Sequence, residues 1–190
     1  TNISLLSGAS SLLVANDNGV ISQWFEVLRD GSRSFMQVRE FTADQSVRDL
    51  APEHSRKGFA TLSGDNHVEL FYTTSHTRLY AENLGSGKLD GISLSPRNSA
   101  LLVQQGDNFQ LFHVENEHPE VSWGSLWGKV WYEGYPEPQF VWQSTSASDD
   151  FEPKLSLVPL AFGTLKAAFY AMLFAVPIAL AGAIYAGYFM

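Results

Sequence analysis

The sequence has no cysteine, which excludes disulfides, thiolate metal sites and cysteine nucleophiles. Positive charge is also scarce: 12 Lys and Arg stand against 20 Asp and Glu, and the formal net charge is −8. Because an acidic chain without a basic run repels phosphodiester backbones, we do not expect it to bind nucleic acid. Walker A (GxxxxGKS/T) and nucleophile-elbow (GxSxG) sequences are missing too, so we expect no enzymatic activity and no cofactor.

Recognisable metal-ligand patterns are lacking as well. The histidines show no zinc-like spacing, and no His-Glu-x-x-His sequence occurs. We expect ordinary loop or strand residues at His54, His67, His76, His113 and His118. The stretch Asn16-Asp17-Asn18-Gly19 resembles a calcium loop only superficially, because Val14 stands where the first ligand would be. It therefore predicts a hairpin turn, and the sequence predicts no metal site.

Charged, amide and histidine side chains are all absent from Ala167–Met190. A helix over this stretch would be about 36 Å long, enough to cross a hydrocarbon core of about 30 Å. A buried helix of a globular domain rarely has this length without a charge, and the many Ala and Gly residues suit helix packing in lipid. We therefore predict a C-terminal transmembrane α-helix rather than a soluble core helix.

The residues before this apolar run predict where the helix starts. Pro159 and Gly163 argue against one uninterrupted helix across residues 155–190. We therefore expect a short lead-in, followed by a helix over about residues 164–190 with Thr164 as its N-cap.

Charges near the helix start bear on its placement in a membrane. Lys166 can reach the lipid headgroups, and Pro177 is expected to kink or loosen the helix. The acidic residues Asp149, Asp150 and Glu152 lie on the same side, which is a weak sign that this side faces outside.

Short apolar runs alternate with turn residues through the first two-thirds of the chain, which predicts strands and hairpins. The same pattern, a predicted strand followed by a turn rich in Asn, Asp and Gly and then a second strand, occurs in residues 12–27, 58–72 and 100–112. Leu50-Ala51-Pro52 recurs 44 residues later as Leu94-Ser95-Pro96, and Gly64-Asp65-Asn66 recurs 42 residues later as Gly106-Asp107-Asn108. A period of about 40–45 residues with four short strands per unit is typical of β-propeller blades.

The repeat resembles the blades of WD-repeat propellers. Trp24, Phe71 and Phe112 take the place of the family's Trp, although Phe25, Tyr72 and His113 replace the Asp that normally follows it. The predicted fold class is mainly β: a partial WD-repeat-like β-propeller of about three four-stranded blades over residues 1–118, followed by a C-terminal transmembrane α-helix. Because propellers typically have four to eight blades, we expect earlier blades upstream of Thr1 and an internal fragment of a longer protein.

Residues 119–153 are predicted to form an aromatic-rich connecting segment and a polar linker. Trp123–Tyr132 is dense in Trp and Tyr, Gln139–Gln143 predicts one short strand, and residues 144–150 are polar. Aromatic residues just before a membrane helix fit an interfacial belt. They fit equally well with closing the last blade or capping the propeller, and the sequence leaves both readings open.

The most specific resemblance lies at the C-terminal end. Residues 151–190 resemble the start of the permease domain of ABC importers, most closely the phosphate permeases of the PstC type. In that family a Leu-Pro segment is followed by Gly-Thr-Leu, an apolar helix with Ala-Val-Pro, and Ala-Ile with an aromatic residue. The matching positions are Phe151, Leu157-Val158-Pro159-Leu160, Gly163-Thr164-Leu165, Ala175-Val176-Pro177-Ile178 and Ala183-Ile184-Tyr185. Residues 154–190 are therefore predicted as the start of a permease transmembrane domain. Larger bacterial members of the family carry a WD-like domain between their first two membrane helices, which agrees with the repeat.

The resemblance implies a permease subunit of the bacterial inner membrane that imports inorganic phosphate. Its implied partners are a second permease subunit, a separate ATPase subunit and a periplasmic phosphate-binding protein. Residues 1 to about 160 would be periplasmic, with the propeller as a docking or regulatory domain. None of the family's phosphate-contact residues can be placed in this chain. The alternative is a membrane-tethered propeller scaffold for protein–protein interaction with no transport role.

Overall fold

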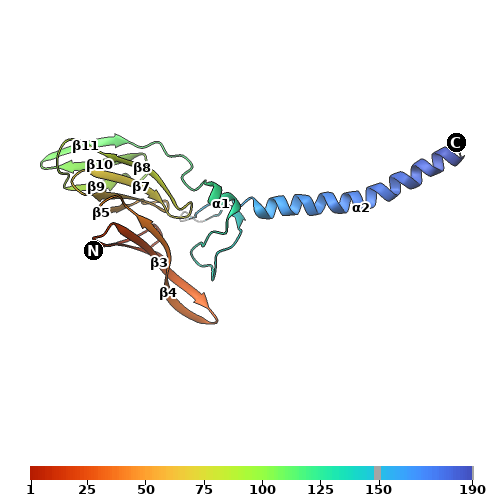
Figure 1. The fold of residues 1–190 in the computed structure, drawn as a ribbon, viewed down its shortest axis with the longest axis horizontal. Coiled ribbons are helices and arrows are strands. Elements are labelled where there is room, and N and C mark those ends of the chain that lie inside the picture. Colours follow the sequence, from red (N-terminus) through yellow and green to blue (C-terminus); the bar gives the residue numbers. More distant parts are fainter. Residues whose placement is uncertain (148–150, 190) are drawn as a thin grey trace.

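Three antiparallel β-sheets follow one another along the chain in the computed structural model, which describes residues 1–147 and 151–189 (Figure 1). Blade 1 has the strand order β1-β2-β3-β4, blade 2 the order β5-β6-β7-β8, and blade 3 the strands β9, β10 and β11. The strands are β1 Asn2–Leu5, β2 Ser11–Ala15, β3 Val20–Arg29, β4 Ser32–Thr42, β5 Val47–Pro52, β6 Gly58–Ser63, β7 His67–Tyr72, β8 Thr77–Asn83, β9 Gly91–Leu94, β10 Ala100–Gln105 and β11 Asn108–His113.

The burial of the strands follows their sequence pattern. In β2, Ser11, Leu13 and Ala15 are buried and the residues between them are only partly buried, as expected for a pleated strand. Strand β6 is buried along its whole length because it is covered on both faces. Gly19 ends the turn between β2 and β3 with φ of +83°, a left-handed conformation that glycine adopts without a Cβ penalty. The predicted hairpin turn at residues 16–19 is confirmed.

The sequence repeat corresponds to a structural repeat. Trp24, Phe71 and Phe112 are each the fifth residue of the third strand of their blade. Each of them lies opposite the second residue of the preceding strand, and these partners are Leu12, Phe59 and Leu101. The predicted WD-like repeat is therefore confirmed down to the strand register.

Apolar side chains fill the two spaces between neighbouring blades. Between blades 1 and 2 lie Leu6, Leu13, Ala15, Ile21, Phe41, Ala43, Val47, Phe59 and Phe71. Between blades 2 and 3 lie Ala51, Ala60, Leu62, Val68, Leu84, Leu89, Leu101 and Val103. In the first layer the rings of Phe59 and Phe71 stack at a centroid distance of 5.2 Å. Each sheet thus buries a face against the next, which is how propeller blades are stabilised.

Blade 3 has three strands among the described residues, where four were predicted. After His113 the chain runs through the charged, proline-containing residues 114–120, which lack the alternation of apolar residues that a fourth strand needs. Strand β11 is consequently an edge strand, and the side chains of Phe109 and Leu111 are 62% and 71% exposed. The mainly β fold with propeller-like blades and a C-terminal helix is confirmed.

The connecting segment after blade 3 contains only short elements. Helix α1 spans Trp123–Trp127, and strands β12 (Trp142–Gln143) and β13 (Lys154–Leu155) pair with each other. The strand predicted over residues 139–143 is shorter than expected, because Gln139 forms only an isolated bridge.

The end of the predicted polar linker, residues 148–150, lies outside the described residues, as do Asp149 and Asp150 of the predicted acidic flank.

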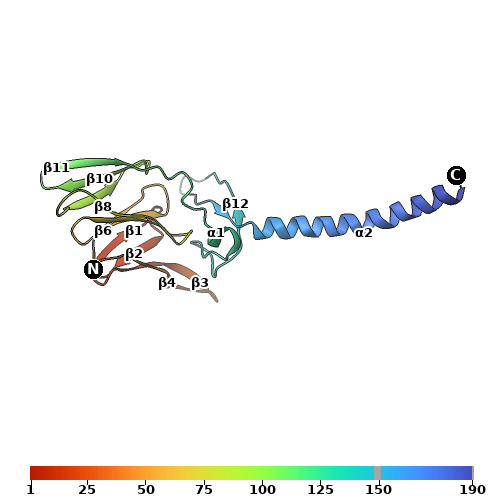
Figure 2. The ribbon, with the colours of Figure 1, turned by 45° about the horizontal axis from the view of Figure 1, so that its top comes forward.

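The C-terminal helix α2 spans Val158–Phe189 and projects away from the sheets (Figure 2). The predicted start near Thr164 is wrong. Pro159 is the second residue of α2, where its missing N–H breaks no intrahelical hydrogen bond, and Gly163 costs only about 1 kcal/mol inside a helix. Thr164 is not the N-cap, because its hydroxyl donates to the carbonyl of Leu160 at 2.9 Å within the helix.

Candidate functional site

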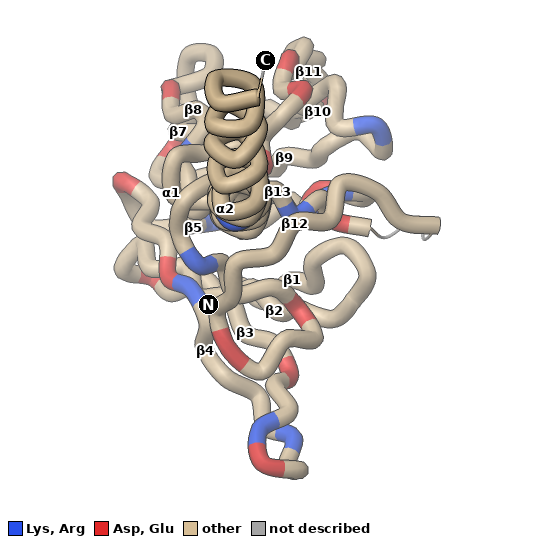
Figure 3. The backbone as a smooth tube through the Cα atoms, turned by 90° about the vertical axis from the view of Figure 1, so that its right-hand side faces the viewer, with Lys and Arg blue, Asp and Glu red and all other residues tan. Residues whose placement is uncertain are grey.

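Helix α2 is apolar on all sides and makes no buried contact with the blades. Among the described residues it is the one helix whose length and composition allow it to cross a membrane, with a mean hydropathy of 2.1. None of its 32 residues is buried. It carries a single charged residue, Lys166, nine residues into the helix, and the rest of its length is uncharged (Figure 3). So much exposed apolar surface is unfavourable in water, and lipid or other helices would cover it.

The permease-motif positions Pro159, Gly163, Thr164, Leu165 and Pro177 all lie on this helix, whereas the matching positions Phe151 and Leu157 precede it. Pro159 and Gly163 are one helical turn apart, and the Leu165 side chain is 70% exposed. A Cβ atom added at Gly163 would meet no atom within 4 Å. The structure therefore arranges the motif along one free helix and does not gather it around a pocket.

Backbone hydrogen bonds fix the start of α2 to the connecting segment. The N–H of Leu157 donates to the carbonyl of Leu126 in α1 at 2.8 Å. The N–H of Ser156 donates to the carbonyl of Val141 at 3.0 Å, next to the β12–β13 pair. These bonds hold the first turn of α2 in a defined orientation against α1 and β12.

Helix α1 presents two tryptophans at this junction. Its start is fixed by a capping box: the Ser122 hydroxyl accepts from the Ser125 N–H at 3.0 Å, and the Ser125 hydroxyl accepts from the Ser122 N–H at 2.8 Å. Trp123 and Trp127 are four residues apart and therefore share one face of the helix. Their side chains are 82% and 48% exposed, whereas Ser125 is buried.

The second half of the aromatic stretch packs on blade 1. The Trp131 ring meets the Phe25 ring edge-on at 6.0 Å, and Tyr132 is only 3% exposed. The guanidinium group of Arg39 in β4 donates to the carbonyl of Trp131. Residues 131–132 thus cover blade 1, as the capping reading predicts for part of the stretch. The α1 tryptophans stay exposed beside α2, and for them the interfacial belt stays a prediction.

A buried ion pair joins the blades to the connecting segment. The Lys57 ammonium lies 2.7 Å from the Glu133 carboxylate, and the two side chains are 8% and 20% exposed. Lys57 also donates to the carbonyl of Ser7 at 2.6 Å, and the Ser11 hydroxyl donates to Glu133. Because both charges have further hydrogen-bond partners, the pair meets the condition under which a buried ion pair is tolerated.

Glu152 adds a second carboxyl group to this charged region. Its Oε1 is buried and has no hydrogen-bond partner among the described residues. Burial raises the pKa of Glu152 to about 7, and the nearby Glu133 carboxylate acts in the same direction. The groups that oppose the rise are Thr74, Arg39 and Lys57. Since Glu152 lies six residues before α2, a group that titrates near neutral pH sits at the propeller–helix junction.

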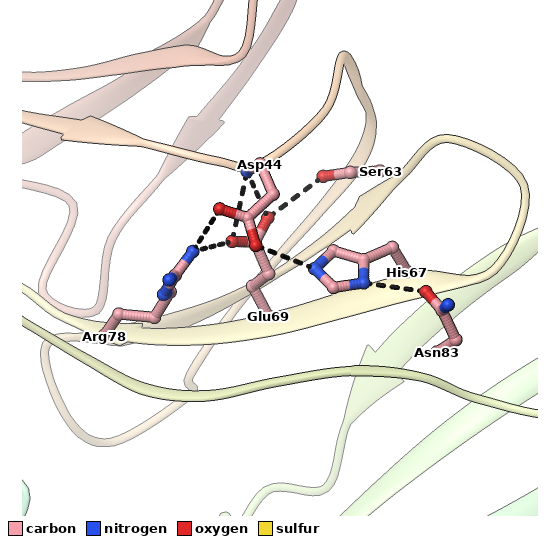
Figure 4. Close-up of polar contacts among 6 residues, drawn as sticks. All are labelled: Asp44, Ser63, His67, Glu69, Arg78 and Asn83. Carbon is pink, nitrogen blue, oxygen red and sulfur yellow. Dashed lines mark hydrogen bonds and ion pairs between the residues drawn. The ribbon is translucent and has the colours of Figure 1, made fainter.

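Blade 2 contains a second polar cluster, shown in Figure 4. The fully buried carboxylate of Glu69 accepts hydrogen bonds from Arg78 at 3.0 Å, and from the Asp44 N–H and the Ser63 hydroxyl at 3.3 Å each. Arg78 also donates to the Asp44 carboxylate at 2.6 Å, and this hydrogen bond holds the pKa of Asp44 below its usual value. The cluster links the loop between blades 1 and 2 to β6, β7 and β8.

Three members of this cluster are potential metal ligands. Ligand atoms of Asp44, His67 and Glu69 lie within 4.8 Å of one another. The guanidinium group of Arg78 is bonded to both carboxylates, so a cation already occupies the space between them. A metal ion would have to displace Arg78, and we therefore interpret the cluster as an ion-pair network that joins strands.

The sequence alone does not reveal either charged cluster. The sequence does contain one indication of the cluster in blade 2: Glu69 stands in the middle of the apolar strand His67–Tyr72, where a carboxylate is buried and requires hydrogen-bond or ion-pair partners. Lys57, Glu133 and Glu152 gave no such signal. Lys57 and Glu133 are 76 residues apart, and Glu133 and Glu152 are 19 residues apart. Only the packing of the connecting segment on the blades brings the three side chains together.

No family model and no curated protein matches the sequence. Among solved structures, the chain is similar to the β-propeller domain of Cps50 (Swd1) from Myceliophteria thermophila, with a TM-score of 0.51 and 12% sequence identity. The match covers 60% of this chain and 38% of that chain, so this protein spans well under half of that domain structure. At this identity the similarity shows the propeller fold alone.

Proposed function

We propose that this chain is part of the membrane-spanning permease subunit of a bacterial, ATP-driven importer of inorganic phosphate. The observation that carries the proposal is that the motif positions from Pro159 to Pro177 lie on one continuous apolar helix, none of whose residues is buried. The first helix of a transport domain needs such a surface for lipid and for neighbouring helices. Gly182 and Gly187 have no atom within 4 Å of an added Cβ, which leaves room for close helix contact.

In this proposal α2 lies in the bacterial inner membrane, and residues 1 to about 160 are periplasmic. The subunit pairs with a second permease subunit and a separate ATPase, and it receives phosphate from a periplasmic binding protein. ATP binding by the ATPase shifts the complete permease between outward-open and inward-open states. Helix α2 has one charged residue, Lys166, near its base, so the phosphate contacts are expected on other helices of the full permease.

The propeller is proposed to dock the binding protein or a regulatory partner. Residues 1–150 hold 19 acidic and 10 basic residues, so this region carries about −9 and repels free phosphate. A docking role is therefore more compatible with its charge than a phosphate-binding role. Uptake of radiolabelled phosphate by cells that depend on the full-length protein tests this, with residues 1–118 and any further blades replaced by a short linker. Loss of uptake or of its regulation is expected, and unchanged uptake and regulation would remove the docking role.

The second candidate function is a membrane-tethered scaffold without transport. It is favoured by the outer strands of blade 3, on which Leu102 of β10 and Phe109 and Leu111 of the edge strand β11 are 38%, 62% and 71% exposed and offer an apolar surface to a protein partner. For a scaffold, α2 is only an anchor, and any apolar helix of the same length would serve. Phosphate uptake separates the two functions, because a scaffold supports none.

A further inference from the structure

Four large aromatic side chains are exposed around the start of α2. They are Trp123, Trp127, Phe140 and Trp142, with exposed fractions of 82%, 48%, 38% and 41%. We call this group the aromatic platform. Trp123 and Trp127 belong to α1, which bonds to Leu157, and Phe140 and Trp142 flank Val141, which bonds to Ser156. The four side chains therefore surround the point where the chain enters the helix. Exposed aromatic groups of this size are unusual on a surface that stays in water.

The platform is held rigidly. The capping box fixes the start of α1, and the Leu126 carbonyl of α1 accepts the N–H of Leu157 at 2.8 Å. Trp142 belongs to β12 and lies directly opposite Leu155 of β13. Both halves of the platform are therefore attached by backbone hydrogen bonds to the two residues before α2, and their position relative to the helix is set. Viewed along α2, helix α1 lies close beside its base (Figure 3).

We propose that the aromatic platform lies in the headgroup region of the bilayer and holds the propeller against the membrane surface. The inference rests on the proposed placement of α2 in a membrane. Trp side chains favour this region because the ring is apolar and the indole N–H can bond to water or headgroups. Two lysines stand next to the platform: Lys129 lies 5.8 Å from the ring centroid of Phe140, and Lys154 pairs with Gln143 across β12 and β13. Ammonium groups at this level attract lipid phosphates.

The exposed apolar side chains in the first turns of α2 also support a position of the platform in the headgroup region. Leu160, Phe162 and Leu165 are 44%, 67% and 70% exposed, although they precede Lys166. If the hydrocarbon began after Lys166, the nine residues from Val158 would stand about 13 Å above it, with these apolar side chains in water. With the platform among the headgroups, the hydrocarbon begins near Leu160, and about 20 residues cross its roughly 30 Å. Lys166 then extends its side chain back to the surface.

Site-directed spin labelling tests the proposal cleanly, because the chain has no native cysteine. Single cysteines are introduced in the whole chain as Trp123→Cys, Ala175→Cys within α2, and Phe109→Cys on β11. Strand β11 lies at the end of the propeller away from α2 (Figure 1), and Phe109 is exposed, so the third label serves as a control in water. The protein is reconstituted in vesicles of phosphatidylethanolamine and phosphatidylglycerol, and collision rates of each label with oxygen and with a water-soluble nickel chelate are measured.

The label at residue 123 is expected to collide with the nickel chelate several-fold less often than the label at 109, while the label at 175 collides mainly with oxygen. If residue 175 is in lipid but residue 123 is as accessible to nickel as residue 109, the platform proposal is overturned and the membrane helix stands. If residue 175 is itself accessible to nickel, the membrane placement of α2 fails, and the platform proposal fails with it.

A variant confirms that the tryptophans cause the shielding. A label at Val121→Cys, which is 44% exposed beside α1, is measured with and without the double substitution Trp123→Ser and Trp127→Ser. The nickel collision rate at residue 121 should rise several-fold in the double variant. Near-ultraviolet circular dichroism of the propeller serves as the folding control, because both indoles are exposed. An unchanged collision rate in the folded double variant would contradict the proposal.

Discussion

The ammonium group of Lys57 lies 2.7 Å from the carboxylate of Glu133, in a buried contact between blade 2 and the connecting segment. Glu133 follows α1 along the chain, and α1 holds the start of α2 through the carbonyl of Leu126. The ion pair therefore lies on a continuous path of contacts from the blades to the apolar helix. A change at this pair affects how firmly the propeller is attached to the helix.

Removal of the Glu133 carboxylate should strongly destabilise the propeller. Glu133→Ala leaves the Lys57 charge buried without its partner, which typically costs about 3–5 kcal/mol of unfolding free energy. Urea unfolding followed by tryptophan fluorescence measures the loss. The matched control is Glu26→Ala, because Glu26 pairs with Arg33 on the surface, where the side chains are 46% and 70% exposed. The control should change stability by less than about 1 kcal/mol, and equal losses in both variants would contradict the burial argument.

The stability of the propeller should depend on the protonation of Glu152. The folded state raises the pKa of Glu152 from its ordinary 4.5 to about 7, so the folded protein binds this proton more tightly than the unfolded chain. The resulting stabilisation is complete below about pH 4.5 and is lost as the pH rises through about 7. The loss is on the order of 3 kcal/mol.

The variant Glu152→Gln carries a neutral side chain of the same shape at every pH. It should be more stable than the natural protein at about pH 8, and the difference between the two should shrink toward about pH 5. Unfolding free energies measured across this pH range decide the matter. A constant difference between the two proteins would show that Glu152 does not titrate in this window.

The cluster around Glu69 should not bind zinc while Arg78 is present. Addition of zinc chloride to the natural protein is expected to leave the midpoint of thermal unfolding unchanged, because Arg78 pairs with both Asp44 and Glu69 and holds the position of a metal ion. Arg78→Ala should lower the midpoint, since it leaves the Glu69 charge buried, and zinc should restore part of the loss through Asp44, His67 and Glu69. A zinc-dependent increase in the natural protein would show instead that the cluster is a metal site.

A close contact between turns should make Gly19 irreplaceable. A Cβ at this position would lie 3.0 Å from the carbonyl oxygens of Ala43 and Gln45, and the φ of +83° adds strain. Gly31 has a similar φ of +77° but no neighbour within 4 Å. Gly31→Ala should therefore cost about 1 kcal/mol from backbone strain alone, and Gly19→Ala distinctly more. Similar losses in the two variants, measured by urea unfolding, would argue against the contact.

The blade pattern could be predicted from the sequence because it rests on local signals. The Asn/Asp/Gly turns and the aromatic positions Trp24, Phe71 and Phe112 recur at a regular spacing, and the structure places them at equivalent positions. The missing fourth strand of blade 3 was not foreseen, since the prediction extended the repeat past His113 into a charged stretch. The sequence predicts the start of α2 too late, because a proline can stand in the first turn of a helix, and Pro159 is the second residue of α2.

The junction could not be predicted from the sequence. Lys57 and Glu133 are 76 residues apart, and neither stands out in its local sequence. One carboxyl oxygen of Glu152 becomes buried only because residues 151–153 lie beside Lys57 and Tyr72 of blade 2. The exposure of Trp123 and Trp127, beside the burial of Tyr132, depends on how residues 119–132 pack, which no period in the sequence reports.

The most direct test of the proposed function is phosphate uptake after exchange of α2. In the full-length protein, Val158–Phe189 is replaced by a leucine-based membrane helix of the same length, in cells that have no other phosphate importer. Membrane fractionation confirms that both proteins are inserted. The natural protein should import radiolabelled phosphate in an ATP-dependent manner, and the exchanged protein should lose uptake, because the motif from Pro159 to Pro177 is gone. Equal uptake by both proteins, or no uptake by the natural one, would contradict the permease proposal and leave α2 as a simple anchor.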